Sequence, residues 1–181
     1  MAERIEIVEV GPRDGLQNEA RPIPTADKVA LVDALSACGF ARIEAASFVS
    51  PRAVPQMADG ADVLAGIERR EGTHYTCLTP NLRGYQAARQ AAADEVAVFA
   101  SASESFSQRN INASIAESLE RFRPVFEAAK ADGMAVRGYV SCVVVCPYEG
   151  PIAPRAVARV AEALAEAGAG EISLGDTVGR G

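Results

Sequence analysis

An arginine and an aspartate stand side by side at Arg13 and Asp14, directly after a β-type run over residues 5–10 and a Gly11-Pro12 break. In a barrel of parallel strands, the active site is assembled from loops at the carboxyl ends of the strands. A cation and an anion at such a strand end could bind and polarise a substrate. The alternative is a solvated ion pair in a loop, which the dipeptide alone leaves open.

Other polar side chains come at or near the ends of further predicted strands. Glu44 stands in the otherwise apolar run 43–46, and Ser47 follows that run. Because burial of an unpaired charge is costly, a buried Glu44 needs a partner, which Arg13 or a metal ion would supply. Since glutamate is seldom fully buried, an outward-pointing Glu44 beneath a helix is the alternative. Asp176 follows the last predicted strand in a glycine-rich turn.

The charged side chains at these strand ends are one cation and three carboxylates: Arg13, Asp14, Glu44 and Asp176. Hard divalent ions such as Mg²⁺ and Mn²⁺ take carboxylate oxygens, whereas zinc prefers histidine and cysteine ligands. The only histidine, His74, precedes the third predicted strand and so belongs to the opposite face of a barrel. The pattern therefore favours a site for Mg²⁺ or Mn²⁺.

Six short runs rich in β-branched residues alternate with stretches of helical period, which predicts an α/β fold with a parallel sheet. The predicted strands are Ile5–Val10, Arg42–Ser47, Tyr75–Thr79, Glu95–Ala100, Val136–Cys142 and Glu171–Leu174. Helices are predicted over 26–38, around 59–70, over 81–93, from the Ser114 cap to Gly133, and over 154–167. The polar stretch 101–112 predicts a long loop, a candidate lid or substrate loop.

This alternation suits a doubly wound sheet or a (β/α)8 TIM barrel. A doubly wound nucleotide-binding sheet needs a glycine-rich phosphate turn after its first strand, and the Gly11–Gly15 segment does not offer one. The barrel is therefore the better interpretation. A complete barrel takes about 250 residues and eight strands, so we expect residues 1–181 to form an incomplete barrel domain with about six of the eight strands.

Composition excludes several classes of function. The 181 residues are 49% hydrophobic and carry a net charge of −6 without a basic run, which argues against nucleic-acid binding. We find no apolar stretch of the roughly 18 residues that a membrane helix needs, and no signal-peptide core, so we expect a cytoplasmic protein without membrane partners. The spacing of the four cysteines makes no zinc knuckle and predicts reduced, packed thiols rather than a disulfide.

The motifs together closely resemble hydroxymethylglutaryl-CoA lyase, a family of the metal-dependent aldolase-like TIM barrels that also include isopropylmalate and homocitrate synthases. The resemblance covers the whole chain. It rests on the segments around the strand ends, namely Val10-Gly-Pro-Arg-Asp-Gly-Leu-Gln-Asn-Glu19, Ser47-Phe-Val-Ser-Pro51, Leu78-Thr-Pro-Asn81, Ala102-Ser-Glu104 with Asn110-Ile-Asn112, Gly138-Tyr-Val-Ser-Cys142 and Ser173-Leu-Gly-Asp-Thr177. The Arg-Asp strand end is shared across the superfamily, whereas Cys146-Pro-Tyr-Glu-Gly150 looks like the lyase.

The resemblance implies cleavage of 3-hydroxy-3-methylglutaryl-CoA to acetyl-CoA and acetoacetate, a step of leucine breakdown and ketone-body formation. Asp14 would ligate the divalent metal, and Arg13 would hold the thioester oxygen of the acyl-CoA substrate and stabilise the forming enolate. Glu44 and Asp176 would shape the site and move protons, with the choice of base left open. Gln17 and Ser47 would be supporting substrate-binding groups.

In the hydroxymethylglutaryl-CoA lyase family that this chain resembles, the other metal ligands and the cysteine of the glycine loop come after the position where this chain ends. We therefore expect a truncated lyase that is inactive or nearly so alone, and a homo-oligomer, such as a dimer, when full length. A eukaryotic homologue would lie in the mitochondrial matrix. The alternatives are a partial barrel that serves as a non-catalytic binding or assembly module, and a related Claisen-type acyl synthase.

Overall fold

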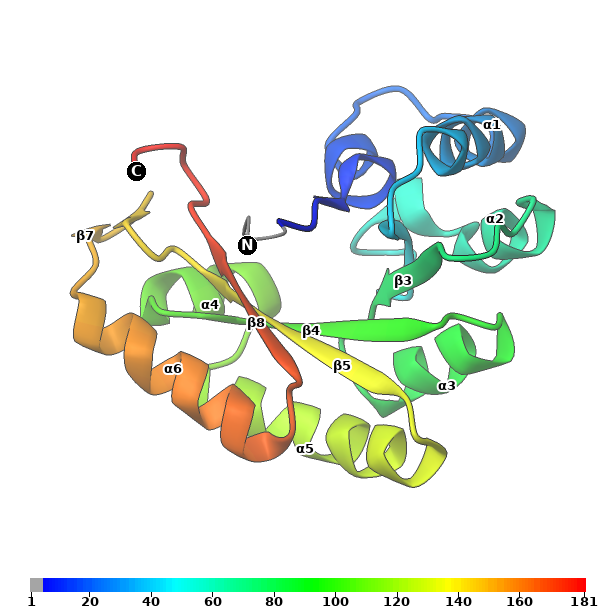
Figure 1. Ribbon diagram of the computed structural model, residues 1–181. Coiled ribbons are helices and arrows are strands. Elements are labelled where there is room, and N and C mark those ends of the chain that lie inside the picture. Colours follow the sequence, from blue (N-terminus) through cyan, green and yellow to red (C-terminus); the bar gives the residue numbers. More distant parts are fainter. Residues whose placement is uncertain (1–4) are drawn as a thin grey trace. The chain divides into compact units, whose positions relative to one another are not determined.

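The computed structural model describes residues 5–181, which form two compact units. The first unit contains residues up to 79 and residues 83–96, and the second contains residues 80–82 and 97–181. Strands and helices alternate along the chain in both units (Figure 1). The predicted α/β pattern is therefore present throughout.

The first unit is built on three parallel strands in chain order. Val8 pairs with Arg42 at the start of this sheet, and Arg42 pairs in turn with His74. Helices α1 and α2 pack against β2 and against each other. The elements are β1 (Val8–Glu9), η1 (Gly11–Gly15), α1 (Thr25–Ala37), β2 (Arg42–Ser47), η2 (Pro55–Met57), α2 (Gly60–Gly66), β3 (His74–Leu78) and α3 (Leu82–Gln90).

The second unit repeats the plan. Its strands follow the order β4-β5-β8, with Arg137 opposite Glu171 and Ser141 opposite Gly175 in the parallel pair β5-β8. Helices α5 and α6 both pack against β5, on the side seen below the strands in Figure 1. The elements are β4 (Glu95–Ser101), α4 (Glu104–Ile111), α5 (Ile115–Asp132), β5 (Ala135–Ser141), β6 (Val145–Cys146), β7 (Gly150–Pro151), α6 (Pro154–Ala167) and β8 (Glu171–Gly175); the first two residues of β4 belong to the first unit.

Each unit has an apolar core between its strands and its helices. In the first unit Val32 of α1, Ile43 of β2 and Val63 of α2 are almost fully buried. In the second unit the same holds for Phe122 of α5 and Leu164 of α6. Burial of each such side chain stabilises the fold by about 1.5–3 kcal/mol, which fixes the strands whose ends carry the polar residues.

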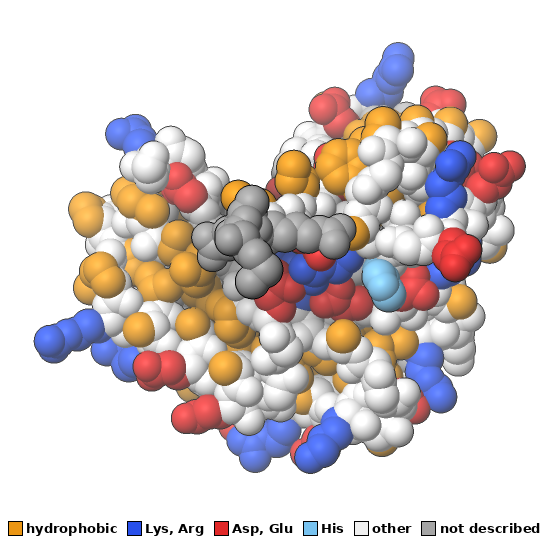
Figure 2. Space-filling view, in the orientation of Figure 1, with side chains coloured by type: hydrophobic (Ala, Val, Ile, Leu, Met, Phe, Trp, Pro, Cys, Tyr) orange, Lys and Arg blue, Asp and Glu red, His pale blue; other side chains and the backbone are white. Residues whose placement is uncertain are grey.

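Strand β8 and the turn after it keep apolar side chains at the surface. Leu174 is 59% exposed and Val178 is 36% exposed. Figure 2 shows hydrophobic side chains gathered on the face over β8. An open strand with exposed apolar side chains is prone to association, as expected of an incomplete barrel.

The six predicted strands are all present, and all but the first lie within one residue of their predicted bounds. The run 5–10 pairs only at Val8 and Glu9, and Ile5 and Ile7 are exposed instead of paired in the sheet. The loop predicted over 101–112 is wrong, because Ser103 accepts a hydrogen bond from the backbone N–H of Phe106 and starts helix α4 there. The assignment of residues 1–181 to one barrel domain stays a prediction.

Candidate active site

The Arg13-Asp14 pair sits on a short turn of π-helix, η1, that leaves the end of β1. Pro12 occupies an early position of the turn, where its missing N–H costs no hydrogen bond. The backbone N–H groups of Arg13 and Asp14 both donate to the carbonyl oxygen of Val10, at 3.1 and 2.7 Å. π-Helical turns occur often at functional sites. Here the turn holds two adjacent charged side chains in fixed positions beside β2.

The Arg13 guanidinium is the centre of a charged cluster. Its Nε donates to the carboxylate of Glu44, and its terminal nitrogen donates to Asp14 Oδ1 at 2.7 Å. Glu44 is completely buried and Arg13 is 8% exposed, whereas the side chain of Asp14 is 58% exposed. A buried ion pair is stable only when both charges are matched, and this pair satisfies that condition. The outward-pointing alternative for Glu44 is wrong.

Two polar atoms near this cluster have no hydrogen-bond partner among the described residues. They are the hydroxyl oxygen of Ser47 and the side-chain carbonyl oxygen of Gln17. Ser47 is 1% exposed at the end of β2, where the backbone of Gly60 approaches it; a Cβ on Gly60 would lie 3.2 Å from the Ser47 carbonyl oxygen. Buried polar groups are normally hydrogen-bonded. A substrate could therefore supply partners for both atoms.

Asp176 lies in the second unit, exposed on the turn that follows β8. Its Oδ2 accepts a hydrogen bond from the backbone N–H of Gly181 at 2.6 Å. The neighbouring Thr177 accepts one from the backbone N–H of Cys142, which ties the turn to the end of β5. The structure thus brings together Arg13, Asp14 and Glu44 in the first unit, and the participation of Asp176 stays a prediction.

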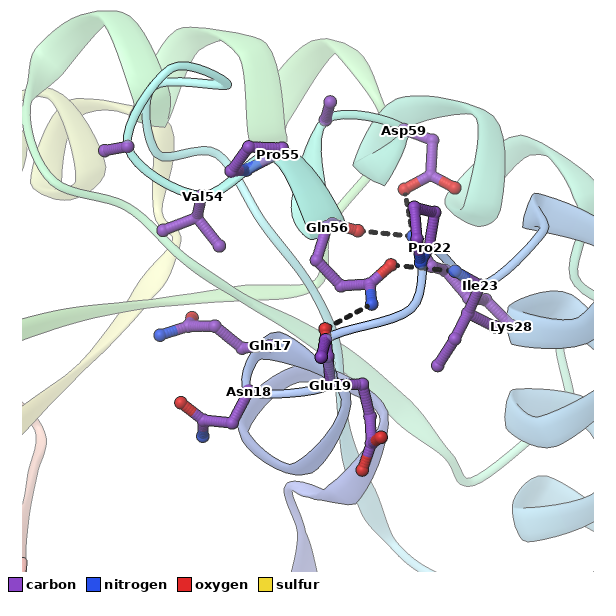
Figure 3. A pocket seen from close by; sticks show the side chains of 13 residues that line it. Gln17, Asn18, Glu19, Pro22, Ile23, Lys28, Val54, Pro55, Gln56 and Asp59 are labelled. Carbon is purple, nitrogen blue, oxygen red and sulfur yellow. Dashed lines mark hydrogen bonds and ion pairs between the residues drawn. The ribbon is translucent and has the colours of Figure 1, made fainter.

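A pocket of about 490 Å3 opens beside the segment that follows η1 in the first unit (Figure 3). Three segments form its walls: residues 17–23 after η1, Lys28 of α1, and residues 53–59 after β2. Gln17 and Asn18 lie on one side in the view, and Val54 and Pro55 on another. Asn18 also donates from its side-chain amide to the backbone carbonyl of Asp14 at 3.0 Å. The pocket wall is therefore hydrogen-bonded to the turn that carries Asp14.

Gln56 fixes the loop that forms this wall. Its amide nitrogen donates to the carbonyl oxygens of Glu19 and Arg21, at 3.1 and 3.0 Å, and its amide oxygen accepts from the N–H of Ile23 at 3.0 Å. Gln56, Asn18 and Lys28 were not predicted from the sequence as site residues. The available signal was weak: a single glutamine between proline and methionine in a mostly apolar stretch.

Lys28 is buried to 5% exposure and lies under the same loop. Its ammonium group donates to Asp59 Oδ1 at 2.6 Å and to the carbonyl oxygen of Gln56. The hydroxyl of Thr25 donates to the other Asp59 oxygen at 2.8 Å. These bonds compensate the buried positive charge of Lys28, because burial of that charge without partners would be too costly.

The donor set fits a divalent metal in part. Asp14 offers an exposed carboxylate with one oxygen paired to Arg13, which suits a hard cation. Within residues 5–181, no group of three or more His, Cys, Asp or Glu side chains could hold a metal ion. Asp14 is therefore the one predicted ligand in this chain, and one carboxylate does not make a metal site alone.

The cysteines are all free thiols. Cys77, Cys142 and Cys146 are buried, as predicted, whereas Cys38 follows the end of α1 and is exposed, so the prediction of a packed thiol is wrong there. Burial raises the pKa of the Cys77 thiol, and the charge of Glu44 raises it further. Burial also opposes ionisation of Cys146, but hydrogen bonds from Ser103 and from backbone N–H groups lower its pKa overall.

The comparisons with known proteins decide the family. The model of the family described as HMGL-like matches residues 4–181. The chain belongs to the HMGL-like family. A 3-hydroxy-3-isohexenylglutaryl-CoA/hydroxy-methylglutaryl-CoA lyase of Pseudomonas aeruginosa is 59% identical over 181 residues, which are 100% of this chain and 60% of the relative. The mitochondrial hydroxymethylglutaryl-CoA lyase of Bos taurus is 57% identical over 98% of this chain and 55% of its own.

A solved structure of the HMG-CoA lyase from Brucella melitensis matches with a TM-score of 0.94 and 61% identity, over 98% of this chain and 64% of that chain. The predicted fold class, an incomplete TIM barrel, is confirmed by this match. The recognition of the lyase family is confirmed by all three comparisons. The HMGL-like chain thus spans about 60% of the length of the curated relative from Pseudomonas.

The HMGL-like family is metal-dependent in general, which agrees with the coarser part of the cofactor prediction. In the part of the chain that the structure describes, every helix is too short or too polar to cross a membrane.

Proposed function

We propose that the whole protein is a hydroxymethylglutaryl-CoA lyase, which cleaves 3-hydroxy-3-methylglutaryl-CoA to acetyl-CoA and acetoacetate. The observation that carries this proposal is the cluster of Arg13 and Asp14, which follow β1, with Glu44 within β2, in a chain of the HMGL-like family. The names of the two lyase relatives support the same substrate class.

In the proposed reaction, a base removes the proton of the substrate's 3-hydroxyl group. The bond between C2 and C3 then breaks, the hydroxyl carbon becomes the ketone of acetoacetate, and the electron pair of the bond passes to the thioester as an enolate. A proton added to the enolate carbon gives acetyl-CoA. The step is balanced, with no oxidant or reductant.

Arg13 would stabilise the enolate oxygen, because it is a guanidinium fixed beside the reaction centre before the charge develops. Its buried pair with Glu44 fixes its orientation, so we assign Glu44 to catalysis mainly through Arg13. Asp176 is the candidate base, from the turn after β8. The Ser47 hydroxyl would donate a hydrogen bond to the bound acyl group, and the side-chain carbonyl oxygen of Gln17 would accept one from the substrate.

Asp14 would hold a divalent metal, with the remaining ligands supplied from outside residues 1–181. Such an ion, when bound, supplies Lewis-acid polarisation of the substrate oxygens. Mg²⁺ and Mn²⁺ are our proposed ions, because the ligand in this chain is a carboxylate. We further propose a cytoplasmic or mitochondrial-matrix protein that forms homo-oligomers.

A second candidate substrate is favoured by one comparison. The Pseudomonas relative is named for 3-hydroxy-3-isohexenylglutaryl-CoA as well as for the methyl compound. We propose that this protein also accepts acyl-CoA substrates whose substituent at C3 is larger than methyl.

The test uses this chain joined after Gly181 to the corresponding C-terminal part of the Pseudomonas relative, called here the completed chain. With 3-hydroxy-3-methylglutaryl-CoA and Mg²⁺, it should form acetyl-CoA and acetoacetate in equal amounts, and a chelator should stop the reaction until metal is restored. The 181-residue chain alone should be inactive or nearly so, because it holds one metal ligand. Absence of acetoacetate from the folded completed chain would contradict the proposal.

A further inference from the structure

The reaction proposed at Arg13 and Asp14 leaves most of the pocket in Figure 3 without a role. Its walls come entirely from the first unit, and its volume of about 490 Å3 falls in the range of about 300–1,000 Å3 that is typical of small-molecule sites. A methyl group at C3 of the substrate would fill little of this space.

Two polar side chains of the pocket, Gln56 and Lys28, are already engaged with the protein. All three hydrogen bonds of the Gln56 side chain go to the backbone of the loop 19–23. Lys28, the cation among the described residues that line the pocket, is paired with Asp59. The other charged lining residue is Glu19, an acid. A phosphate or a carboxylate would therefore meet two acids and a cation that is already neutralised, so an anionic ligand is disfavoured.

Most of the other lining residues are apolar, which favours an apolar ligand. Seven of the thirteen lining residues carry no polar side-chain atom: Ala20, Pro22, Ile23, Ala53, Val54, Pro55 and Ala58. An apolar group transferred from water to such a surface gains about 25 cal/mol for each Å2 that it buries. The pocket therefore suits a short hydrocarbon chain.

The position of the pocket connects this ligand with the reaction. Asn18 lines the pocket and bonds to the backbone of Asp14, and Gln17 presents an unpartnered oxygen in the same wall. We propose that the pocket receives the apolar substituent at C3 of 3-hydroxy-3-alkylglutaryl-CoA substrates that are larger than the methyl compound. The inference rests on the proposed function, since it needs the glutaryl group to be held by Arg13 and Asp14.

The kinetic test compares two substrates of the completed chain, the 3-methyl thioester and a homologue with butyl in place of methyl. Val54→Phe places a ring in the pocket, and Ala53→Leu fills it less. Each variant should lower kcat/KM for the butyl thioester by about tenfold or more relative to kcat/KM for the methyl thioester. Ala61→Leu, on the exposed face of α2 and outside the pocket, is the matched control and should leave the ratio unchanged.

A binding readout separates this inference from the proposed function. In the 181-residue chain, the methyl NMR signals of Ile23 and Val54 should shift on addition of the butyl thioester and shift less with the methyl thioester. Equal losses of kcat/KM for both substrates would assign the pocket to a part common to both thioesters and overturn the inference. So would signals that respond identically to the two compounds. Failure of the methyl thioester to react at all would contradict the proposed function, while the NMR comparison still decides the pocket.

Discussion

At the scale of single residues, the account depends on one buried cation and its two carboxylate neighbours. Glu44 is fully buried and contacts Arg13, while Asp14 reaches solvent and keeps one carboxylate oxygen beside the guanidinium. The two acids therefore differ in their surroundings, although both contact the same arginine. In the proposed function, the buried acid would orient the guanidinium and the exposed acid would hold a metal ion.

The Arg13-Glu44 pair should contribute strongly to stability. Arg13→Met removes the guanidinium from a fully buried carboxylate and should lower the free energy of unfolding by about 3–5 kcal/mol, measured by urea denaturation. The double variant Arg13→Met/Glu44→Gln should recover much of this loss, because no buried charge is then left behind. Arg123→Met, from an exposed pair with Glu120, is the control and should change stability by about 1 kcal/mol or less. A double variant no more stable than the single one would refute the explanation.

At the scale of elements, sequence reasoning worked where local chemistry sets a boundary. Ser114 and Glu117 form the capping box that the spacing predicts, and Gly133 ends the same helix with a φ of +69°. The prediction failed after Ser103. The segment Glu104–Ile111 is short and mostly polar, so without recognition of the Ser103 cap it was predicted as a loop. The three side-chain hydrogen bonds of Gln56 were not predictable either, because they reach backbone groups 33–37 residues away in the sequence.

The capping box of α5 predicts a pH dependence. The backbone N–H and the hydroxyl of Ser114 hold the pKa of the Glu117 carboxyl below its usual 4.5. Because the folded-state pKa is lowered, the stabilisation is complete above that usual value and is lost as the pH falls through the lowered one. Glu117→Gln keeps the hydrogen bonds without the charge, so its stability relative to the wild type should improve as the pH falls from about 6 to about 3.

Urea denaturation over that pH range measures the effect. Glu127→Gln, which removes an exposed carboxylate of the same helix outside the capping box, is the control. A difference between wild type and Glu117→Gln that stays constant over the whole range would contradict the assignment.

At the scale of the molecule, the alternation of strands and helices sufficed to predict the barrel class, because each βα unit repeats the same local signals. The site was harder. Arg13, Asp14 and Glu44 were predictable as a group because adjacent parallel strands place their carboxyl ends together. Lys28 and Asn18 were not, because α1 and the loop after η1 carry no strand-end signal. The pocket lies between segments that are distant in the sequence, so no local sequence pattern predicts it.

In the proposed function, Arg13 stabilises the charge that develops in the transition state of carbon–carbon bond cleavage. The most direct measurement is kcat of the completed chain with 3-hydroxy-3-methylglutaryl-CoA and saturating Mg²⁺, for wild type, Arg13→Lys and Arg13→Ala, with circular dichroism to confirm folding. We expect Arg13→Ala to lower kcat by about 100- to 1,000-fold with a much smaller change in KM. The kcat of Arg13→Lys should lie between those of the wild type and Arg13→Ala. A folded Arg13→Ala enzyme with undiminished kcat would contradict this role of Arg13.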